Sequence, residues 1–229
     1  MRQAKVFAGV CVYKYWEPES RRSFDELISY SGRDNWVLSH FQELYGESLI
    51  SRGRNTIMEK FIESKDDYLF TMDADIVCFT PHALRELVND ISGPSVGITS
   101  APYIYKNPPY RWAFRPYEVG DYDMRSKNRR FKVKYTSSGF MLVSRDAATY
   151  AIKAWRECNG NLYQPLYHEG EYLSEDWALC RRISSCDYLI YVNPLIKLGH
   201  IGQYIFTEQD FYGLLERENN AKKLIKEIS

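Results

Sequence analysis

Two kinds of hydrophobic pattern alternate through the first hundred residues. Residues 6–13 form an unbroken apolar run, as a strand buried on both faces does, and residues 68–72 and 96–99 form two shorter runs. Apolar side chains recur at helical spacing in residues 23–31 and 48–64, and again after Thr80-Pro81, a good helix start. This alternation predicts an α/β fold with a mostly parallel central sheet and helices on both faces.

The second half has shorter strands and longer irregular segments. We expect strands at residues 131–135, 140–144 and 188–192, and helices at 145–157 and from Ser174 to about Ile183. Residues 102–130 and 159–173 are predicted to be irregular, and residues 208–228 to be helical and charged. The short strands indicate a small antiparallel extension of the sheet. No repeat or linker divides the chain, so we expect a single domain over residues 1–229.

Charge and cysteine content narrow the classes of function. The 229 residues contain 30 Lys and Arg against 30 Asp and Glu, which argues against a nucleic-acid partner. No apolar stretch reaches the length of a transmembrane helix, and the apolar run near the N-terminus is too short for a signal peptide. The five cysteines are odd in number and form no Cys-x-x-Cys pair, so we expect reduced thiols and a cytoplasmic protein.

The most informative local pattern is an acidic pair at the end of a predicted strand. Asp73 and Asp75 follow the run 68–72, and side chains two residues apart in extended chain point to the same side. Oxygen ligands in this arrangement suit a hard divalent cation that shares its coordination with phosphate oxygens. The carboxyl ends of strands are also where open α/β sheets bind ligands. The alternative is a turn in which both aspartates serve only as caps.

Three further groups of residues could contribute to the same site. Arg54 and Asn55 lie near a predicted helix start, where cations and backbone N–H groups bind phosphate. Glu175 and Asp176 open a predicted helix; they suit its dipole without any function, but a carboxylate held there could also accept a proton. His200 lies between glycines in a predicted loop, and imidazole with carboxylates suits Mn²⁺.

Taken together, these elements resemble the GT-A glycosyltransferases. The resemblance rests on Asp73-Ala74-Asp75 after a strand, Arg54-Asn55 before it, the strand Ser138–Leu142, Glu175-Asp176 and Gly199-His200, in the order and approximate spacing of that family. It covers residues 4–205 and is closest to the small soluble enzymes of large viruses, phages and bacteria. It implies a nucleotide-binding half over about 1–100, an acceptor-binding half over about 101–205 and C-terminal helices over 206–229.

The resemblance also implies roles for individual residues. The donor would be a nucleotide-diphosphate-sugar, with a UDP-sugar as the family expectation, and the acceptor a glycan or another hydroxyl compound. Asp73, Asp75 and His200 would hold Mn²⁺ or Mg²⁺, and Asp176 would be the base of an inverting transfer, with Glu175 as the alternate. The nucleotide would contact Val10, Val12, Tyr13, Arg54, Asn55 and Asp73, and the sugars would contact Ser138, Gly139, Trp112 and Trp177.

Two other classes of protein share parts of this pattern. A haloacid-dehalogenase-type phosphatase also places Asp-x-Asp after an apolar strand, with Asp73 as nucleophile and Asp75 as acid and base. That motif normally lies on the first strand of its domain, whereas here another strand and a helix precede it. A non-enzymatic carbohydrate-binding protein could use the 19 tyrosines as stacking platforms, but it would not need two carboxylates at a strand end.

Overall fold

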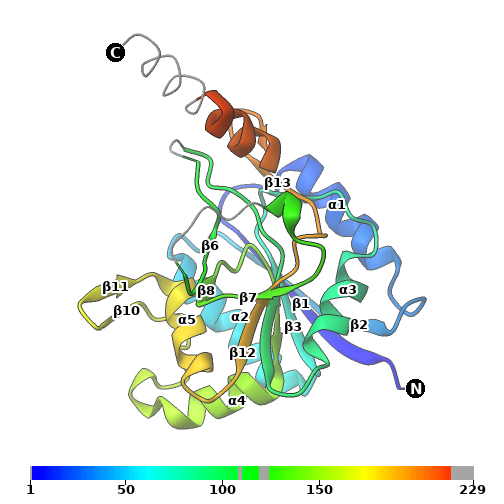
Figure 1. Ribbon diagram of the computed structural model, residues 1–229. Helices are drawn as coiled ribbons and strands as arrows, with labels where there is room; N and C mark the ends of the chain where they lie inside the picture. The colour runs from blue at the N-terminus through cyan, green and yellow to red at the C-terminus, as the bar shows by residue number, and fades with distance from the viewer. Residues whose placement is uncertain (1, 108–109, 119–123, 218–229) are drawn as a thin grey trace.

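The central element of the molecule is a mixed seven-stranded sheet, seen in a computed structural model that describes residues 2–107, 110–118 and 124–217 (Figure 1). In spatial order its strands are β2 (Trp36–Tyr45), β1 (Ala4–Val12), β3 (Tyr68–Met72), β9 (Phe140–Ser144), β5 (Val96–Ser100), β12 (Leu189–Val192) and β7 (Phe131–Lys132). Strands β9 and β7 pair antiparallel with their neighbours, and the other five strands run in one direction. The sheet is therefore mostly parallel, as the sequence predicts.

Helices cover both faces of this sheet and create two hydrophobic cores. Helices α1 (Pro18–Ser29) and α3 (Ala83–Ile91) pack on one face, where Phe24 and Leu87 join the side chains of alternate strand residues such as Phe70. Helices α2 (Ile50–Ser64), α4 (Arg145–Ala154) and α5 (Glu175–Ser184) pack on the other face, and there Ile57 contributes to the second core. In Figure 1, α1 and α3 lie to the right of the sheet, and α4 and α5 lie to its lower left.

Short strands and 3-10 turns complete the described part of the chain. Strands β4 (Ile76–Cys78), β13 (Leu198–Ile201) and β14 (Ile205–Phe206) form a small antiparallel sheet beyond the end of β3. Strand β6 (Phe114–Arg115) pairs with β8 (Tyr135–Thr136), and β10 (Leu166–His168) pairs with β11 (Glu171–Leu173). The 3-10 turns are Met124–Ser126 and Arg156–Cys158, and residues 208–217 are helical.

Most predicted elements are confirmed, and the departures have physical causes. His200 lies in strand β13 rather than in a loop, because β13 pairs with β4 across the end of β3. Residues 159–173 are not wholly irregular: they contain the β10–β11 hairpin, whose turn places Glu169 and Gly170 at φ 52° and 79°. Strand β2 had not been predicted from the sequence. The predicted helix 208–228 is observed to residue 217, and its remainder lies outside the described residues.

Two other sequence expectations concern the cysteines and the membrane. All five cysteines are free thiols, and no two are joined by a disulfide. In the part of the chain that the structure describes, we find no helix with the length and apolar character needed to span a bilayer.

Candidate active site

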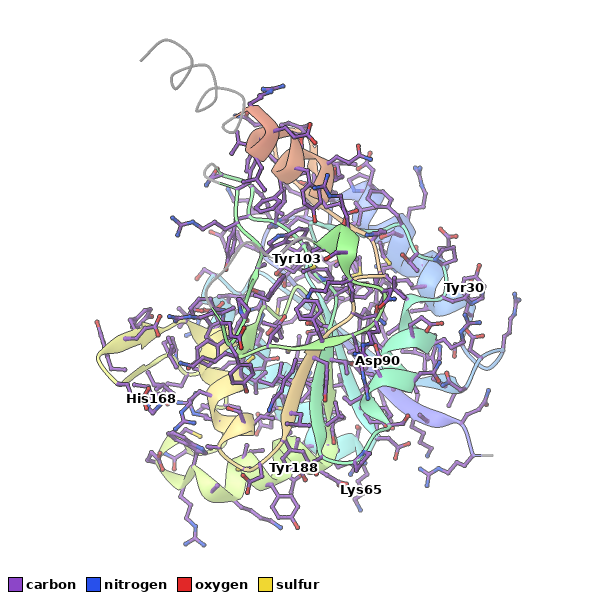
Figure 2. All side chains as sticks on the ribbon, in the orientation of Figure 1. Tyr30, Lys65, Asp90, Tyr103, His168 and Tyr188 are labelled. Atoms are coloured by element: carbon purple, nitrogen blue, oxygen red, sulfur yellow. The ribbon has the colours of Figure 1, made fainter. Side chains whose placement is uncertain are left out.

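A cleft of about 660 Å³ opens at the carboxyl ends of the parallel strands. The residues that follow β1 and β3 line it, together with the start of α5 and the segment after β5. Figure 2 labels Tyr103, which lines the cleft, at the end of the sheet opposite Lys65 and Tyr188. The volume is within the range of cofactor and substrate pockets, and the position is where α/β sheets bind ligands.

The acidic pair occupies the turn between β3 and β4. The backbone N–H of Asp73 donates to the Gly139 carbonyl at 2.9 Å, which anchors the turn to the start of β9. Gly139 is required there, because a Cβ would lie 2.4 Å from the Tyr103 hydroxyl and 3.0 Å from the Asp73 carboxylate. The backbone N–H of Ile201 in β13 donates to the Asp75 carbonyl at 2.8 Å. Both aspartates are therefore held by their main chains.

Arg54 is the buried centre of the acidic cluster. It points from the second turn of α2, and its side chain is only 6% exposed. Its Nη2 donates to both oxygens of Asp73, at 2.8 and 3.1 Å, and its Nη1 donates to Glu175 at 3.0 Å and to Asp176. One guanidinium thus joins the strand-end pair to the first turn of α5. Guanidinium geometry suits this task, because it offers five donors in a fixed plane.

The charges of this cluster are strongly coupled. Burial lowers the pKa of the Arg54 guanidinium, but Asp176 and Asp73 outweigh it and hold that pKa well above its ordinary value. Burial raises the pKa of the Asp73 carboxyl, against the opposing effect of Arg54. Burial also raises the pKa of Glu175, and the neighbouring charge of Asp176 adds to the effect. Glu175 is therefore a stronger proton acceptor than an ordinary surface glutamate.

His200 lies beside Asp75, with one ring nitrogen toward it. Its Nδ1 lies 2.9 Å from the Ile104 carbonyl, and because a carbonyl can only accept, this nitrogen carries the hydrogen. The other ring nitrogen, Nε2, faces Oδ1 of Asp75 at 3.6 Å. When Nε2 carries no hydrogen, its lone pair and the carboxylate can bind one cation between them. The donor set, one carboxylate and one imidazole, fits Mn²⁺ or Mg²⁺ that completes its coordination with phosphate and water oxygens.

Asp75 also has a protein counter-ion. Lys106 donates to its other oxygen, Oδ2. Burial raises the pKa of Asp75, but the contacts from His200 and Lys106 outweigh it and lower that pKa to about 2. Among the described residues, no three Asp, Glu, His or Cys side chains converge as a complete metal cage. A cation held here would thus depend on a bound diphosphate for further ligands.

The predicted nucleotide-binding residues divide into three groups. Tyr13 and the two cluster members Arg54 and Asp73 line the cleft. Val10 and Val12 are buried in the core beneath α1 and α3, so their side chains do not line it. Asn55 accepts a hydrogen bond from the backbone of Tyr163 at 2.9 Å and lines a separate hollow beside α2.

The predicted sugar-binding residues lie around the cleft rather than in it. Gly139 borders Asp73 directly, and Ser138 is buried, with its carbonyl accepting from Thr71 at 2.7 Å. Trp177 stacks on Tyr135 at 5.2 Å beside the first turn of α5. Trp112 lines a smaller neighbouring hollow and contacts Phe211 of the C-terminal helical segment at 5.1 Å.

Sequence reasoning missed several residues that line the cleft or contact its carboxylates. These are Cys11, Tyr15, Tyr103, Tyr105, Lys106 and Ser137. Cys11 could have been predicted from the sequence, because it lies near the end of a predicted strand that leads to the site. The others lie in irregular segments, where hydrophobic periodicity carries no information about side-chain direction.

Comparisons with known proteins establish the fold. No family model matches the chain, and no curated protein matches its sequence. Among solved structures, the chain superposes on A197 from STIV with a TM-score of 0.57 and 14% identity, over 88% of this chain and 86% of that one. It superposes on GalNAc-T7, solved with UDP, GalNAc and Mn²⁺, with a TM-score of 0.55 and 13% identity, over 88% of this chain and 44% of that one. The molecule has the GT-A glycosyltransferase fold.

Proposed function

We propose that this protein is a metal-dependent glycosyltransferase that moves a sugar from a nucleotide-diphosphate donor, a UDP-sugar, to an acceptor hydroxyl. The observation that carries the proposal is the arrangement at the carboxyl end of β3. There, Asp75 faces the imidazole of His200, and Asp73 is joined by one guanidinium to Glu175 and Asp176. A haloacid-dehalogenase-type phosphatase would not need this set of contacts in a GT-A fold, and neither would a non-enzymatic carbohydrate-binding protein.

In the proposed site, the chain's residues divide into a diphosphate side and an acceptor side. Asp75 and His200 would hold Mn²⁺ or Mg²⁺ on the diphosphate side, and the cation would stabilise the charge of the departing nucleoside diphosphate. The GalNAc-T7 structure, which contains UDP and Mn²⁺, supports this choice of donor and metal. Asp73, fixed by Arg54, would bind the ribose or the metal's water shell. Tyr13 would contact the base.

On the acceptor side, the pair that opens α5 would remove a proton from the attacking hydroxyl. Asp176 is the proposed base of an inverting displacement. Burial and the neighbouring Asp176 charge raise the pKa of Glu175, which favours this residue as a second candidate. Ser138 and Gly139 would support the donor sugar beneath Asp73, with Trp177 and Trp112 toward the acceptor.

A thermal-shift panel of UDP- and GDP-sugars, each with and without Mn²⁺, tests the donor and the metal. We expect the wild-type protein to be stabilised by a UDP-sugar only with Mn²⁺, and Asp75→Ala to lose this shift. Asp25→Ala is the matched control, because Asp25 is an exposed aspartate of α1 paired with Arg21. An undiminished shift in Asp75→Ala would refute the metal assignment. Release of phosphate from simple phosphate esters would instead support the phosphatase.

The base is identified by comparing Asp176→Asn with Glu175→Gln. The variant that removes the base should bind donor and metal as the wild type does but lose transfer by about 100-fold or more. Transfer is followed by NMR, which also gives the anomeric configuration of the product. Retained configuration, or full activity of both variants, would contradict the proposed inverting base.

A further inference from the structure

A lysine without any sequence signal contacts the proposed metal ligand. Lys106 donates to Oδ2 of Asp75, while Nε2 of His200 faces Oδ1 of the same carboxylate. A divalent cation bound between Asp75 and His200 would lie within a few ångströms of this ammonium group. Like charges at such a separation repel. Lys106 and the metal therefore compete for one carboxylate.

The backbone that carries Lys106 is tied to the same histidine. The Ile104 carbonyl accepts from His200 at 2.9 Å, and the Tyr103 ring contacts the imidazole edge-on at 5.2 Å. The lysine stem passes over Gly202, where its Cδ lies 3.2 Å from the position a Cβ would take. The tether is thus fixed, while the Lys106 side chain is 31% exposed, and its ammonium, on a long flexible stem, can change partners.

The charges around the cleft give the ammonium a second partner. Arg54 is committed to Asp73, Glu175 and Asp176, so Asp75 depends on Lys106 for its protein counter-ion. A donor diphosphate at this sheet edge would bring anionic oxygens next to Asp75. An ammonium displaced from Asp75 by a metal would then find phosphate oxygens within the reach of its side chain.

We propose that Lys106 is an exchangeable counter-ion of this site: it neutralises Asp75 until a divalent cation takes that carboxylate, and it then binds the donor diphosphate. The inference rests on the proposed function. Lys106 would then strengthen binding of the donor but weaken binding of the metal when no donor is present. A residue of merely structural importance would not have these two opposite effects.

Calorimetric titration of Lys106→Met with two probes tests this pair of effects. With Mn²⁺ alone, we expect binding about fivefold tighter or more than in the wild type, the factor from one charge removed at about 4 Å even in water. With UDP or GDP in saturating Mn²⁺, we expect binding about tenfold weaker, because a charge-assisted contact is lost. Lys106→Arg should restore nucleotide binding in part. Lys197→Met is the control, since Lys197 pairs with Glu208 outside the cleft, and it should change neither value.

The possible outcomes distinguish failure of the Lys106 proposal from failure of the proposed glycosyltransferase function. Equal Mn²⁺ affinity in the wild type and Lys106→Met overturns the competition, whatever the nucleotides do. Tighter Mn²⁺ binding with unchanged nucleotide binding overturns the transfer of Lys106 to the diphosphate. A wild-type protein that binds Mn²⁺ but neither nucleotide refutes the proposed function and leaves the competition to be judged by the metal alone. A melting curve confirms that each variant is folded.

Discussion

Replacing Arg54 with methionine should be among the most damaging single changes in this protein. Methionine has a similar length but no charge, so three carboxylates that share one guanidinium would face one another without a counter-ion. Removing one partner of a fully buried ion pair costs about 3–5 kcal/mol. The side chains of Asp73, Glu175 and Asp176 are 28%, 21% and 13% exposed, so water screens them in part. We therefore expect a loss of about 2–4 kcal/mol in unfolding free energy at pH 7.

The penalty should depend on pH in a defined direction. Burial already raises the pKa values of the Asp73 and Glu175 carboxyls, and loss of the opposing Arg54 charge raises them further above their unfolded values. Groups of this kind destabilise the folded state relative to the unfolded one at neutral pH, and the effect fades as the pH falls and the carboxyls are protonated. Urea unfolding of the wild type and Arg54→Met at pH 7 and pH 4.5 measures this. The difference between the two proteins should be smaller at pH 4.5.

A matched control lies two residues away on the same helix. Arg52 is 67% exposed and pairs with Glu47, so Arg52→Met should cost no more than about 1 kcal/mol. If Arg54→Met cost as little as Arg52→Met, or if its penalty were the same at both pH values, the account of Arg54 as the charge centre of the site would be refuted.

Three other predictions concern close packing and a buried thiol. Gly139→Ala should destabilise the protein by about 1–3 kcal/mol in thermal unfolding, because its Cβ would meet the Tyr103 ring; an unchanged midpoint would show that this contact gives way. Gly9→Ala should cost a similar amount alone but under about 1 kcal/mol when added to Ile57→Ala, since its Cβ would lie 2.3 Å from Ile57 Cγ2; additive penalties in the double-mutant cycle would contradict this. Burial raises the pKa of the Cys180 thiol from 9.0 to about 12, so its contribution to stability is complete below pH 9 and is lost as the pH rises toward 12. The wild type should therefore lose about 1 kcal/mol more than Cys180→Ala between pH 8.5 and pH 10, and parallel pH profiles would contradict this.

The strands and helices of the core were predictable because burial imposes a period on the sequence. The strands Tyr68–Met72 and Phe140–Ser144 were predicted with their observed bounds, since both are apolar on each face. Strand β2 was not predicted, because it lies at the edge of the sheet and its half-exposed residues show neither a continuous apolar run nor a clean alternation. The β10–β11 hairpin was not predicted either, because exposed residues such as Tyr167 and Tyr172 give it no clear apolar pattern.

The candidate site was predictable only where a residue type and a strand end coincide. Asp73 and Asp75 satisfied both conditions, and the structure places them in the cleft. The contacts that define their chemistry could not be predicted, because they depend on where an irregular segment is held. Lys106 reaches Asp75 through a backbone anchored on His200, nearly a hundred residues away in sequence. Val10 and Val12 show a different limit: their strand ends at the cleft, but their side chains are packed in the core, which the position in the strand alone does not reveal.

The reversed strand β9 has a consequence for synthesis of the chain on the ribosome. It lies between β3 and β5 and supplies the hydrogen bonds of both, although it follows them by some forty residues or more. Until residues 140–144 leave the exit tunnel, two apolar strands have exposed edges of the kind that promote aggregation. A nascent chain in which β3 and β5 have left the tunnel but β9 has not should therefore need protection by chaperones, and the turn that holds Asp73 is completed only when Gly139 emerges.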